Sequence, residues 1–336
     1  MLIRALDPHD VTRAGVWYAA LRAGASAGRV APPVVSEHSL LTSLRTNDTN
    51  TFNDRRAYGA WDGDACLGAT VVNLPRGDNQ HLIEIDINVP PEHRRRGTGG
   101  ALFEHALRIA RAEHRTTATN EVDVNGVDAA LADTDGGRFA LARGFAVKNT
   151  ERRLMLDVPV PDEGLAELDL YARERAAGYR AVSWLGLTPD AWLASHARMH
   201  TLMSQDVPRG DSDWEPLAYD ADRLRSTQTR SMQQGYGLVT TLVIDDAGAP
   251  AAYTKMLVNP DGAHVLQDET FVLRAHRGHR LGTLAKVANL RELAAHHPQA
   301  RHVHTWTAEV NDAMRSINER FGFREVETMY EVELSL

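Results

Sequence analysis

The sequence predicts an α/β (α+β) protein with two domains, each a mixed, mostly antiparallel sheet flanked by helices. The chain has 336 residues, more than one domain of ordinary size usually contains. A series of short motifs recurs in the same order in the second half of the chain. Arg277, for example, lies 183 residues after its counterpart Arg94 (277 − 94). In both halves, period-2 strand patterns run into a glycine-rich turn and then into a helical pattern.

The repeat consists of three pairs of motifs. They are Val89-Pro-Pro-Glu-His93-Arg94 with Val272-Leu-Arg-Ala-His276-Arg277, Glu121-Val-Asp-Val-Asn125 with Thr307-Ala-Glu-Val-Asn311, and Arg143-Gly144-Phe145 with Phe321-Gly322-Phe323. A period of this length indicates duplicated domains and not a solenoid of short repeats.

Strands are expected at equivalent places in the two halves. In the first half they cover residues 57–62, 66–74, 82–89 and 117–124, and in the second half residues 238–244, 251–258, 264–272 and 302–307. A helix follows each turn, with apolar stripes Leu102, Phe103, Ala106, Leu107, Ala110 and Leu284, Val287, Ala288, Leu290, Leu293. Each half then continues with a helix that ends at Gly144 or Gly322 and with a closing strand.

The expected boundary lies where prolines interrupt regular structure. Val158-Pro-Val-Pro removes backbone donors and fixes φ at two positions. We therefore expect an N-terminal domain at 1–157, a linker at 158–167 and a C-terminal domain at 168–336.

Composition limits the partners that suit this chain. The net charge is −8 and the pI is about 6.0, so no overall basic field favours nucleic acid, and no apolar run is long enough to span a membrane. Cys66 is the single cysteine and cannot form an intramolecular disulfide. We expect a cytoplasmic protein that acts on a small molecule, as a monomer or a homodimer, with no metal site, because the histidines lack ligand spacing.

The turn Arg94-Arg95-Arg96-Gly97-Thr98-Gly99-Gly100 carries the strongest chemical signal. A strand that ends in a glycine-rich turn before a helix leaves backbone N–H groups unpaired, and these groups bind anions such as a diphosphate. Taken alone, such a turn is more often a packing feature in which glycines relieve crowding.

This turn resembles the acyl-CoA-binding motif of the GNAT superfamily, in which Arg or Gln is followed by two residues, Gly, one residue, and Gly or Ala. Arg94, Gly97 and Gly99 match that pattern. The second copy resembles it less closely, because Arg280 occupies the place of the first glycine. The resemblance extends over nearly the whole chain, in an arrangement that is similar to tandem acetyltransferases.

The resemblance implies that acetyl-CoA (coenzyme A) is the cofactor. The residues that would contact it are Ile87, Val89, Arg94, Arg95, Arg96, Gly97, Thr98, Gly99, Gly100 and Asn125 in the first half, and Val272, Arg277, Gly278, His279, Arg280, Leu281, Gly282, Thr283 and Asn311 in the second. For both asparagines, capping of the following helix is an equally good interpretation.

Acetyl transfer to an amine needs the amine deprotonated, and the resemblance implies that a candidate base lies on the strand before the turn. Glu84 and Asp86 share one face in the first half, whereas Asp268 and Glu269 are consecutive, so at most one of them is expected to face the site. Solvated strand carboxylates are the alternative interpretation.

The position where the family usually has its general acid differs in this chain. Many members have a tyrosine four residues before the closing Gly-Phe, where this chain has Ala140 and Asn318. Tyr330 or a bound water is the candidate substitute in the second half.

The sequence therefore predicts a GNAT-type N-acetyltransferase that acts on the primary amine of a small molecule by direct attack, with the first half catalytic. The second half is expected to be degenerate, to shape the acceptor pocket or to work separately. Two alternatives stay open: a non-catalytic acyl-CoA-binding or scaffolding protein, and a protein-lysine acetyltransferase.

Overall fold

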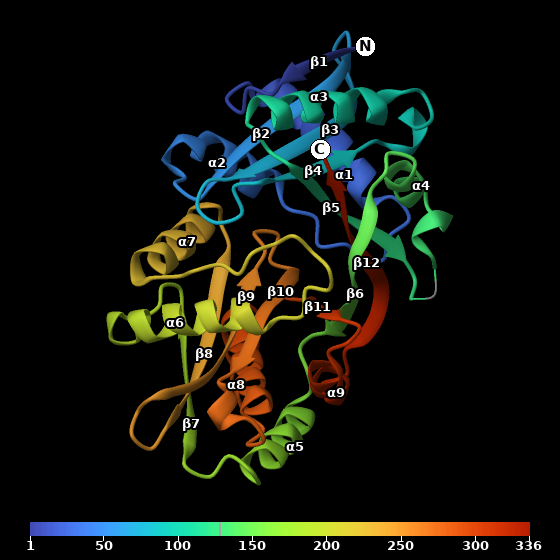
Figure 1. Ribbon diagram of the computed structural model, residues 1–336. Helices are drawn as coiled ribbons and strands as arrows, with labels where there is room; N and C mark the ends of the chain where they lie inside the picture. Colours follow the sequence, from blue (N-terminus) through green and yellow to red (C-terminus); the bar gives the residue numbers. More distant parts are fainter. Residues whose placement is uncertain (128) are drawn as a thin grey trace. The chain divides into compact units, whose positions relative to one another are not determined.

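The computed structural model describes residues 1–127 and 129–336 and divides into two compact units. The first unit comprises Met1–Arg152, Arg209–Glu215 and Val326–Leu336, and the second comprises Arg153–Pro208 and Pro216–Glu325. Figure 1 shows that each unit consists of strands with helices packed on them.

The sheet of the first unit has one parallel pair of strands. Its order is β1 (Leu2–Ala5), β2 (Asn53–Asp62), β3 (Ala65–Pro75), β4 (Leu82–Asn88), β5 (Thr117–Asn125) and β12 (Arg324–Ser335). β4 and β5 run parallel, and the other neighbours pair in antiparallel fashion.

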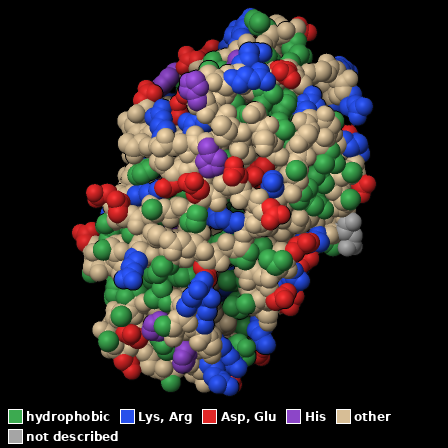
Figure 2. Space-filling view, viewed as in Figure 1, with side chains coloured by type: hydrophobic (Ala, Val, Ile, Leu, Met, Phe, Trp, Pro, Cys, Tyr) green, Lys and Arg blue, Asp and Glu red, His purple; other side chains and the backbone are tan. Residues whose placement is uncertain are grey.

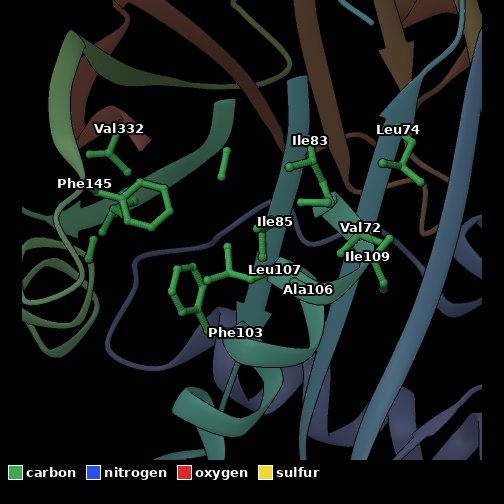
Figure 3. Close-up of a cluster of buried hydrophobic side chains, with 14 of the residues drawn as sticks. Val72, Leu74, Ile83, Ile85, Phe103, Ala106, Leu107, Ile109, Phe145 and Val332 are labelled. Atoms are coloured by element: carbon green, nitrogen blue, oxygen red, sulfur yellow. The ribbon is translucent and has the colours of Figure 1, made fainter. Parts of the chain in front are cut away.

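Helices cover both faces of this sheet because successive strand residues point to opposite sides. Val72, Ile83 and Ile85 pack under α3 (Thr98–Ala112) and beside α4 (Asp135–Leu141), together with the predicted stripe of α3. Figure 3 shows Phe103, Ala106 and Leu107 of that stripe against the strands. Val71 faces the opposite layer, formed by α1 (Val11–Ser26) and α2 (Glu37–Arg45).

The second unit repeats this plan. Its strand order is β7 (Tyr179–Leu185), β8 (Gly237–Asp245), β9 (Pro250–Val258), β10 (His264–Val272), β11 (His302–Ala308) and β6 (Ala146–Asp157), of which only the part from Arg153 belongs to this unit. β10 pairs with β11 in parallel. The helices are α5 (Asp162–Arg173), α6 (Asp190–Asp206), α7 (Ala221–Gln233), α8 (Leu281–His296) and α9 (Asp312–Arg320). α8 packs on one face, and α6 packs on the other.

Short 3-10 turns connect these elements at four places. They are η1 (Asn47–Thr49), η2 (Pro91–His93), η3 (Leu131–Asp133) and η4 (Arg274–His276). η2 and η4 immediately precede the two glycine-rich turns.

The closing strand of each unit comes from the other half of the sequence. Residues Glu327–Ser335 of β12 pair with Asn125–Thr117 of β5 in the first unit, where Val332 is fully buried in the core. Conversely, Leu154 and Leu156 of β6 lie in the core of the second unit. The units therefore differ from the expected domains at both closing strands, because pairing over such long sequence separations leaves no local pattern.

The predicted fold class of two mixed, mostly antiparallel sheets flanked by helices is confirmed. All eight strands that the repeat predicted are present, with bounds shifted by a few residues at most. The expected linker at 158–167 contains the start of α5, which begins at Asp162 directly after Pro161.

Candidate active site

The two glycine-rich turns have the same backbone conformation. In the first unit, Arg95 and Gly97 have φ values of +59° and +84°. In the second unit, the equivalent Gly278 and Arg280 have φ values of +84° and +53°. Each turn thus has one glycine and one arginine in left-handed conformations, and the arginine costs about 1 kcal/mol in either case.

This geometry changes the interpretation of Arg280. From the sequence, Arg280 in place of a glycine was expected to interrupt the second turn. The structure shows that Gly278 takes over one left-handed position and Arg280 adopts the other, so the turn is retained.

Both turns open onto helix N-termini that no side chain caps. α3 begins at Thr98 after Gly97, α8 begins at Leu281 after Arg280, and neither first turn receives a side-chain hydrogen bond from the described residues. By contrast, Asp10, Ser36, Thr134, Asp220 and Asn311 cap α1, α2, α4, α7 and α9. Free N–H groups and the helix dipole make both turns suitable for a phosphate group.

The basic side chains at the first turn are largely available to a ligand. Arg94 donates through Nε to the carbonyl oxygen of Val89 at 3.0 Å and approaches Asp135 at 3.6 Å. Arg95 and Arg96 are exposed and form no ion pair within the described part of the chain. Their charges are therefore free to attract an anion.

At the second turn the equivalent charges are paired. Arg277 binds Val272 in the same way as its counterpart, but its guanidinium also contacts Asp206. Arg280 donates to the Glu174 carboxylate at 2.7 Å and stacks over the Tyr171 ring at 3.6 Å. These contacts reduce the positive charge that the second turn presents to a ligand.

Histidines also make local contacts around the second turn. His276 Nδ1 lies 2.9 Å from the Tyr179 hydroxyl, and His279 Nδ1 lies 3.1 Å from the carbonyl oxygen of Arg175. Leu281, Gly282 and Thr283 are buried in the first turn of α8. Thr98 is buried at the equivalent place in α3, while Gly99 and Gly100 are partly exposed.

In each unit the parallel strands separate next to the turn. β4 pairs with β5 only from Leu82 to Glu84, although β4 continues to Asn88. β10 pairs with β11 only from His264 to Leu266, although β10 continues to Val272. The separation frees strand N–H groups that can polarise a carbonyl beside the turn.

A β-bulge distinguishes the second unit and corrects an expectation. The register between β10 and β9 shifts at Asp268, between Gln267 and Glu269. Asp268 and Glu269 were expected to face opposite ways, yet Lys255 Nζ lies 3.0 Å from one carboxylate and 3.4 Å from the other. The extra residue breaks the strict alternation of the strand, so both side chains reach the same side.

Carboxylates of the first unit gather on one open face of its sheet. Glu84 and Asp86 on β4 share this face with Glu121 and Asp123 on β5, and Glu331 on β12 is directly opposite Glu121. Asn73 donates to Glu84 at 3.3 Å, and Asn88 donates to Asp86 at 2.9 Å. Like charges placed this close make a face that favours a cation.

The electrostatics of this face raise several pKa values. Desolvation, together with the charge of Asp123, raises the pKa of Asp86 to about 6, although its side chain is exposed. Desolvation and the charges of Asp123 and Glu331 raise the pKa of Glu121 to about 8. Desolvation also raises the pKa of Glu84. A carboxylate with a pKa near 6 is well matched to act as a base at neutral pH.

One cation that follows α1 partly balances this face, and sequence reasoning missed it. Arg29 lies 2.8 Å from Asp123 and 2.7 Å from Glu327, whose side chain is fully buried. Its position just after α1 gives no sequence signal, because the partner Glu327 is 298 residues away.

The carboxylate of the second unit is buried and fully partnered. Glu269 accepts hydrogen bonds from the Tyr253 hydroxyl and from His200 Nδ1, the latter at 2.8 Å. Desolvation would raise the pKa of Glu269, but the neighbouring His200, Lys255 and Tyr253 hold it well below its usual range. Sequence reasoning identified Glu269 and missed its partner His200 on α6.

The two candidate asparagines differ. Asn311 accepts a hydrogen bond from the Met314 N–H at 3.2 Å and caps α9, which is the alternative that the sequence left open. Asn125 is exposed at the end of β5, and its side chain has no hydrogen-bond partner among residues 1–127 and 129–336. Ile87, Val89 and Val272 are partly buried along the two strand ends.

Tyr330 requires a correction. It was expected to serve the second half, but it lies on β12 in the first unit, opposite Val122. Its ring packs against the core beneath α3, and its hydroxyl donates to the carbonyl oxygen of Ala129 at 3.3 Å. Because the closing strands are exchanged, this tyrosine belongs with the first turn.

In the second unit, a buried lysine reaches the position where the family tyrosine is missing. Lys286 on α8 is 2% exposed and donates to Asn318 Oδ1 at 2.6 Å. Desolvation lowers the pKa of Lys286 to about 7. No sequence pattern indicates this residue, because a lysine in an amphipathic helix normally faces solvent.

The surface is mixed in charge on the face shown in Figure 2, where Lys and Arg side chains are interspersed with Asp and Glu. None of the described helices combines the length and apolar composition that a membrane crossing requires. Across the described chain, no three or more His, Cys, Asp or Glu side chains gather as ligands for a metal ion.

Comparisons with known proteins agree with this geometry. Residues 30–132 match the model of the Acetyltransferase (GNAT) family. A solved structure described as a tandem GNAT protein from the clavulanic acid biosynthesis pathway is 28% identical, covers 99% of this chain and 98% of its own, and has a TM-score of 0.81. No curated protein matches the sequence.

Two more distant structures share the fold. A GCN5-related N-acetyltransferase from Sphaerobacter thermophilus is 14% identical with a TM-score of 0.63, and covers 99% of this chain and 95% of its own. A putative acetyltransferase from Pyrococcus horikoshii is 14% identical with a TM-score of 0.57, and covers 100% of this chain and 89% of its own.

The family match lies over the first turn, and the tandem neighbour extends over nearly the whole chain, including the second turn. The chain thus has two GNAT-like folds with an uncapped turn in each, and residues 30–132 of the first match the GNAT family of acetyltransferases, enzymes of the acyltransferase class.

Proposed function

We propose that the protein transfers an acetyl group from acetyl-CoA to the primary amine of a small molecule, and that the first unit catalyses this transfer. One observation carries the proposal: the uncapped N-terminus of α3 opens beside β4 and β5 where these strands separate. Asp86 and Glu84 are both on β4. The similar tandem GNAT structure, which is described as determined without AcCoA, supports the choice of donor.

In this proposal the first turn holds the diphosphate of the donor. The free N–H groups of α3 and the charges of Arg95 and Arg96 attract it, while Gly97 allows the backbone to approach closely. Asn125, exposed at the end of β5, would contact the arm of the donor. Equivalent binding at the second turn is weaker, because Arg277 and Arg280 are already paired with Asp206 and Glu174.

The chemical step follows from the residues around the separated strands. Asp86, with its pKa raised to about 6, accepts a proton from the acceptor ammonium at neutral pH. The amine then attacks the thioester carbonyl directly, the N–C bond forms, and the C–S bond breaks. Tyr330 on β12, which packs on the α3 side of the sheet in this unit, is the candidate to protonate the leaving thiolate.

The acidic face favours an acceptor with more than one positive charge. Glu121, Asp123 and Glu331 line the sheet next to Asp86, with Arg29 as their cationic neighbour. A polyamine or a similar basic small molecule would complement this surface better than a neutral amine. The same charges would suit a lysine in a basic protein segment, which is the second candidate acceptor.

The test measures thiol release from acetyl-CoA over a panel of polyamines, amino sugars, amino acids and basic peptides. We expect turnover with a multiply charged amine, and a loss of about 10²–10⁴-fold in kcat/KM for Asp86→Asn. Glu104→Gln, on the exposed side of α3, serves as the matched control and should keep full activity. If no amine is acetylated although acetyl-CoA binds, the non-catalytic binding protein would be the better account.

A further inference from the structure

Arg29 connects two strands of the first unit at the open end of its sheet. The residue follows α1, and its guanidinium lies 2.8 Å from Asp123 on β5. Its Nε and one terminal nitrogen donate to the two carboxylate oxygens of Glu327 on β12, at 3.0 Å and 2.7 Å. A planar guanidinium that donates two parallel hydrogen bonds to one carboxylate has a fixed orientation. Arg29 therefore holds Asp123 and Glu327 at a set spacing.

The chain that leads to Arg29 is fixed on a third strand, β4. A Cβ atom added to Gly24, near the end of α1, would lie 2.8 Å from the backbone nitrogen of Val89 and 2.9 Å from the carbonyl carbon of Asn88. Glycine permits this close approach of two backbones because it has no side chain. A turn then follows, in which the N–H of Arg29 donates to the carbonyl oxygen of Ser26 at 3.1 Å. The end of α1 is thus anchored on β4, while Arg29 reaches β5 and β12.

This connection, which we call the Arg29 clasp and which consists of residues 24–29, crosses the gap between the two parallel strands. β4 and β5 pair as far as Glu84 and Thr119, and within the described part of the chain this pairing does not continue over residues 85–88. The clasp joins the two strands at a place where the sheet itself does not. The spacing of the strands at the gap therefore depends on the clasp.

The guanidinium of Arg29 is already occupied by protein oxygens. A guanidinium has five N–H groups. One terminal nitrogen serves both Asp123 and the carbonyl oxygen of Ala25, the latter at 3.3 Å, so that four of the five N–H groups of Arg29 are directed at protein oxygens. The side chain is 16% exposed. Arg29 must therefore act on the reaction through the groups that it holds, and not by binding the acceptor.

The candidate base Asp86 lies within the electrostatic reach of the clasp. Desolvation is the main reason that the pKa of Asp86 is raised to about 6, and a hydrogen bond from Asn88 opposes this rise. Among the neighbouring charges, Asp123 raises the pKa of Asp86, whereas Arg29 and Arg55 on β2 lower it. The other carboxylates of this face are Glu84, Glu121 and Glu331. The two members of one ion pair, Arg29 and Asp123, thus act on Asp86 with opposite signs.

We propose that Arg29 is a positioning residue for the base of the first unit: it clasps β4, β5 and β12 at the gap and holds Asp123 on the face that Asp86 shares. The inference rests on the acetyl transfer proposed above, because it treats Asp86 as the group that takes the acceptor proton. Arg29 contributes no atom to the reaction. It fixes the carboxylate that disfavours the charge of Asp86 and supplies the cation that offsets this carboxylate.

The first experiment compares Arg29→Gln with Asp123→Asn in the full chain. Carbon NMR of the Asp86 carboxyl group gives its titration midpoint, and this measurement does not depend on turnover. Loss of the arginine charge should raise the midpoint by about half a pH unit, and loss of the aspartate charge should lower it by about as much. The shifts are modest because the face is open to solvent. Damage to folding alone would not move the midpoint in opposite directions.

The same variants are then assayed for thiol release from acetyl-CoA with spermidine as the acceptor. Since the acidic limb of kcat/KM reports the essential base of the free enzyme, it should follow the Asp86 midpoint. It should move to higher pH in Arg29→Gln and to lower pH in Asp123→Asn. Arg22→Gln removes an exposed arginine from α1 and is the matched control, in which neither the midpoint nor the limb should shift.

Arg29→Lys separates the charge of the clasp from its shape. A lysine keeps a positive charge next to Asp123 but cannot donate the two parallel hydrogen bonds to Glu327, whose side chain is fully buried. The thermal midpoint should therefore fall in Arg29→Lys as well as in Arg29→Gln. The acidic limb should stay in place in the lysine variant and move only in the glutamine variant. A role confined to folding would leave the limb in place in both.

The outcomes distinguish this inference from the function on which it depends. An Asp86 midpoint that stays in place in Arg29→Gln would overturn the inference, as would shifts of the same sign in Arg29→Gln and Asp123→Asn. The inference also fails if an amine is acetylated but the acidic limb does not follow the midpoint. If the midpoints move as expected and no amine is acetylated, the action of Arg29 on Asp86 is supported and the proposed function is wrong.

Discussion

The two glycine-rich turns have one backbone conformation and different electrostatic surroundings. Gly97 and Arg280 occupy the same left-handed position, and so do Arg95 and Gly278. In the first unit Arg95 and Arg96 form no ion pair with the described residues, and the carboxylates beside the turn gather on an open face. In the second unit the turn arginines are paired, and Glu269 is enclosed by histidine, tyrosine and lysine.

This contrast teaches that a motif position can change while the turn persists. A sequence pattern that requires glycine at one fixed place would reject the second turn, yet the left-handed conformations are simply distributed differently over the two residues. What separates the units is which charges remain available to a ligand, and that depends on Asp206 and Glu174, far away in the sequence.

The largest expected effect concerns the exchanged strands. A chain that ends at Glu325 should lose the first unit entirely, because β5 loses its partner along Thr117–Asn125 and the core loses Val332. The loss should exceed the roughly 5–15 kcal/mol that stabilises a typical domain. Hydrogen exchange should show unprotected β5 amides while β8 and β9 stay protected.

Deletion of Met1–Ala5 is the matched control for that truncation, since β1 is a largely exposed strand at the edge of the same sheet. This deletion should leave β5 protected. If β5 stays protected in the chain that ends at Glu325, the pairing of β12 with β5 does not hold the first unit together.

The buried lysine gives the next largest effect, in the second unit. The pKa of Lys286 falls from its ordinary 10.5 to about 7. The unfolded chain therefore keeps this proton between pH 7 and about 10 while the folded chain releases it, and stability rises with pH in that window. Lys286→Met should raise the free energy of unfolding at pH 7 by about 2–4 kcal/mol and flatten this rise.

Denaturant unfolding of the second unit at pH 7 and pH 9.5 measures both effects. Arg291→Met removes an exposed charge from the same helix and should change the free energy of unfolding by less than about 0.5 kcal/mol. A Lys286→Met protein that is less stable at pH 7 would show that the amine makes a favourable interaction there.

The acidic face of the first unit should respond to pH in the opposite direction and more weakly. The folded chain holds a proton on Glu121 up to about pH 8, whereas an ordinary glutamate releases it near 4.5. Stability of the first unit should therefore fall as pH rises through this window. Glu121→Gln should raise the thermal midpoint at pH 8 and not at pH 4.5.

Because Glu121 is exposed, the gain should stay below about 1 kcal/mol. Glu104→Gln, which removes an exposed carboxylate from α3, should show no such pH dependence. Equal midpoints for the Glu121 variant and the unmodified protein at pH 8 would mean that solvent screens the repulsion with Asp123 and Glu331.

Local patterns predicted the fold well. The strand bounds, the stripe of α3 and both turns depend on residues close together in sequence, and all of them are present. The exchange of β6 and β12 could not be predicted, because each strand has the same apolar pattern whichever sheet it joins. The bulge at Asp268 likewise depends on register with β9, which no single strand reveals.

The candidate site was predictable only in part. Asp86 and Glu269 were found because they precede a turn, but His200, Lys286 and Arg29 have no motif. Lys286 is buried because α8 is covered on both sides, by the sheet and by α5 and α9. An amphipathic interpretation of α8 places a lysine in solvent, so that burial becomes visible only once the helices are packed.

The most direct test of the contrast is calorimetric titration of acetyl-CoA against three proteins: the unmodified chain, Arg95→Glu with Arg96→Glu, and His279→Glu. His279 is the equivalent of Arg96 in the second turn. We expect a tighter site that weakens about thirtyfold in the first variant, from roughly 1 kcal/mol for each reversed exposed charge. The tighter site should be unchanged in His279→Glu. Loss of the tighter site in His279→Glu, with the arginine variant unaffected, would contradict the assignment of the first turn as the stronger donor site.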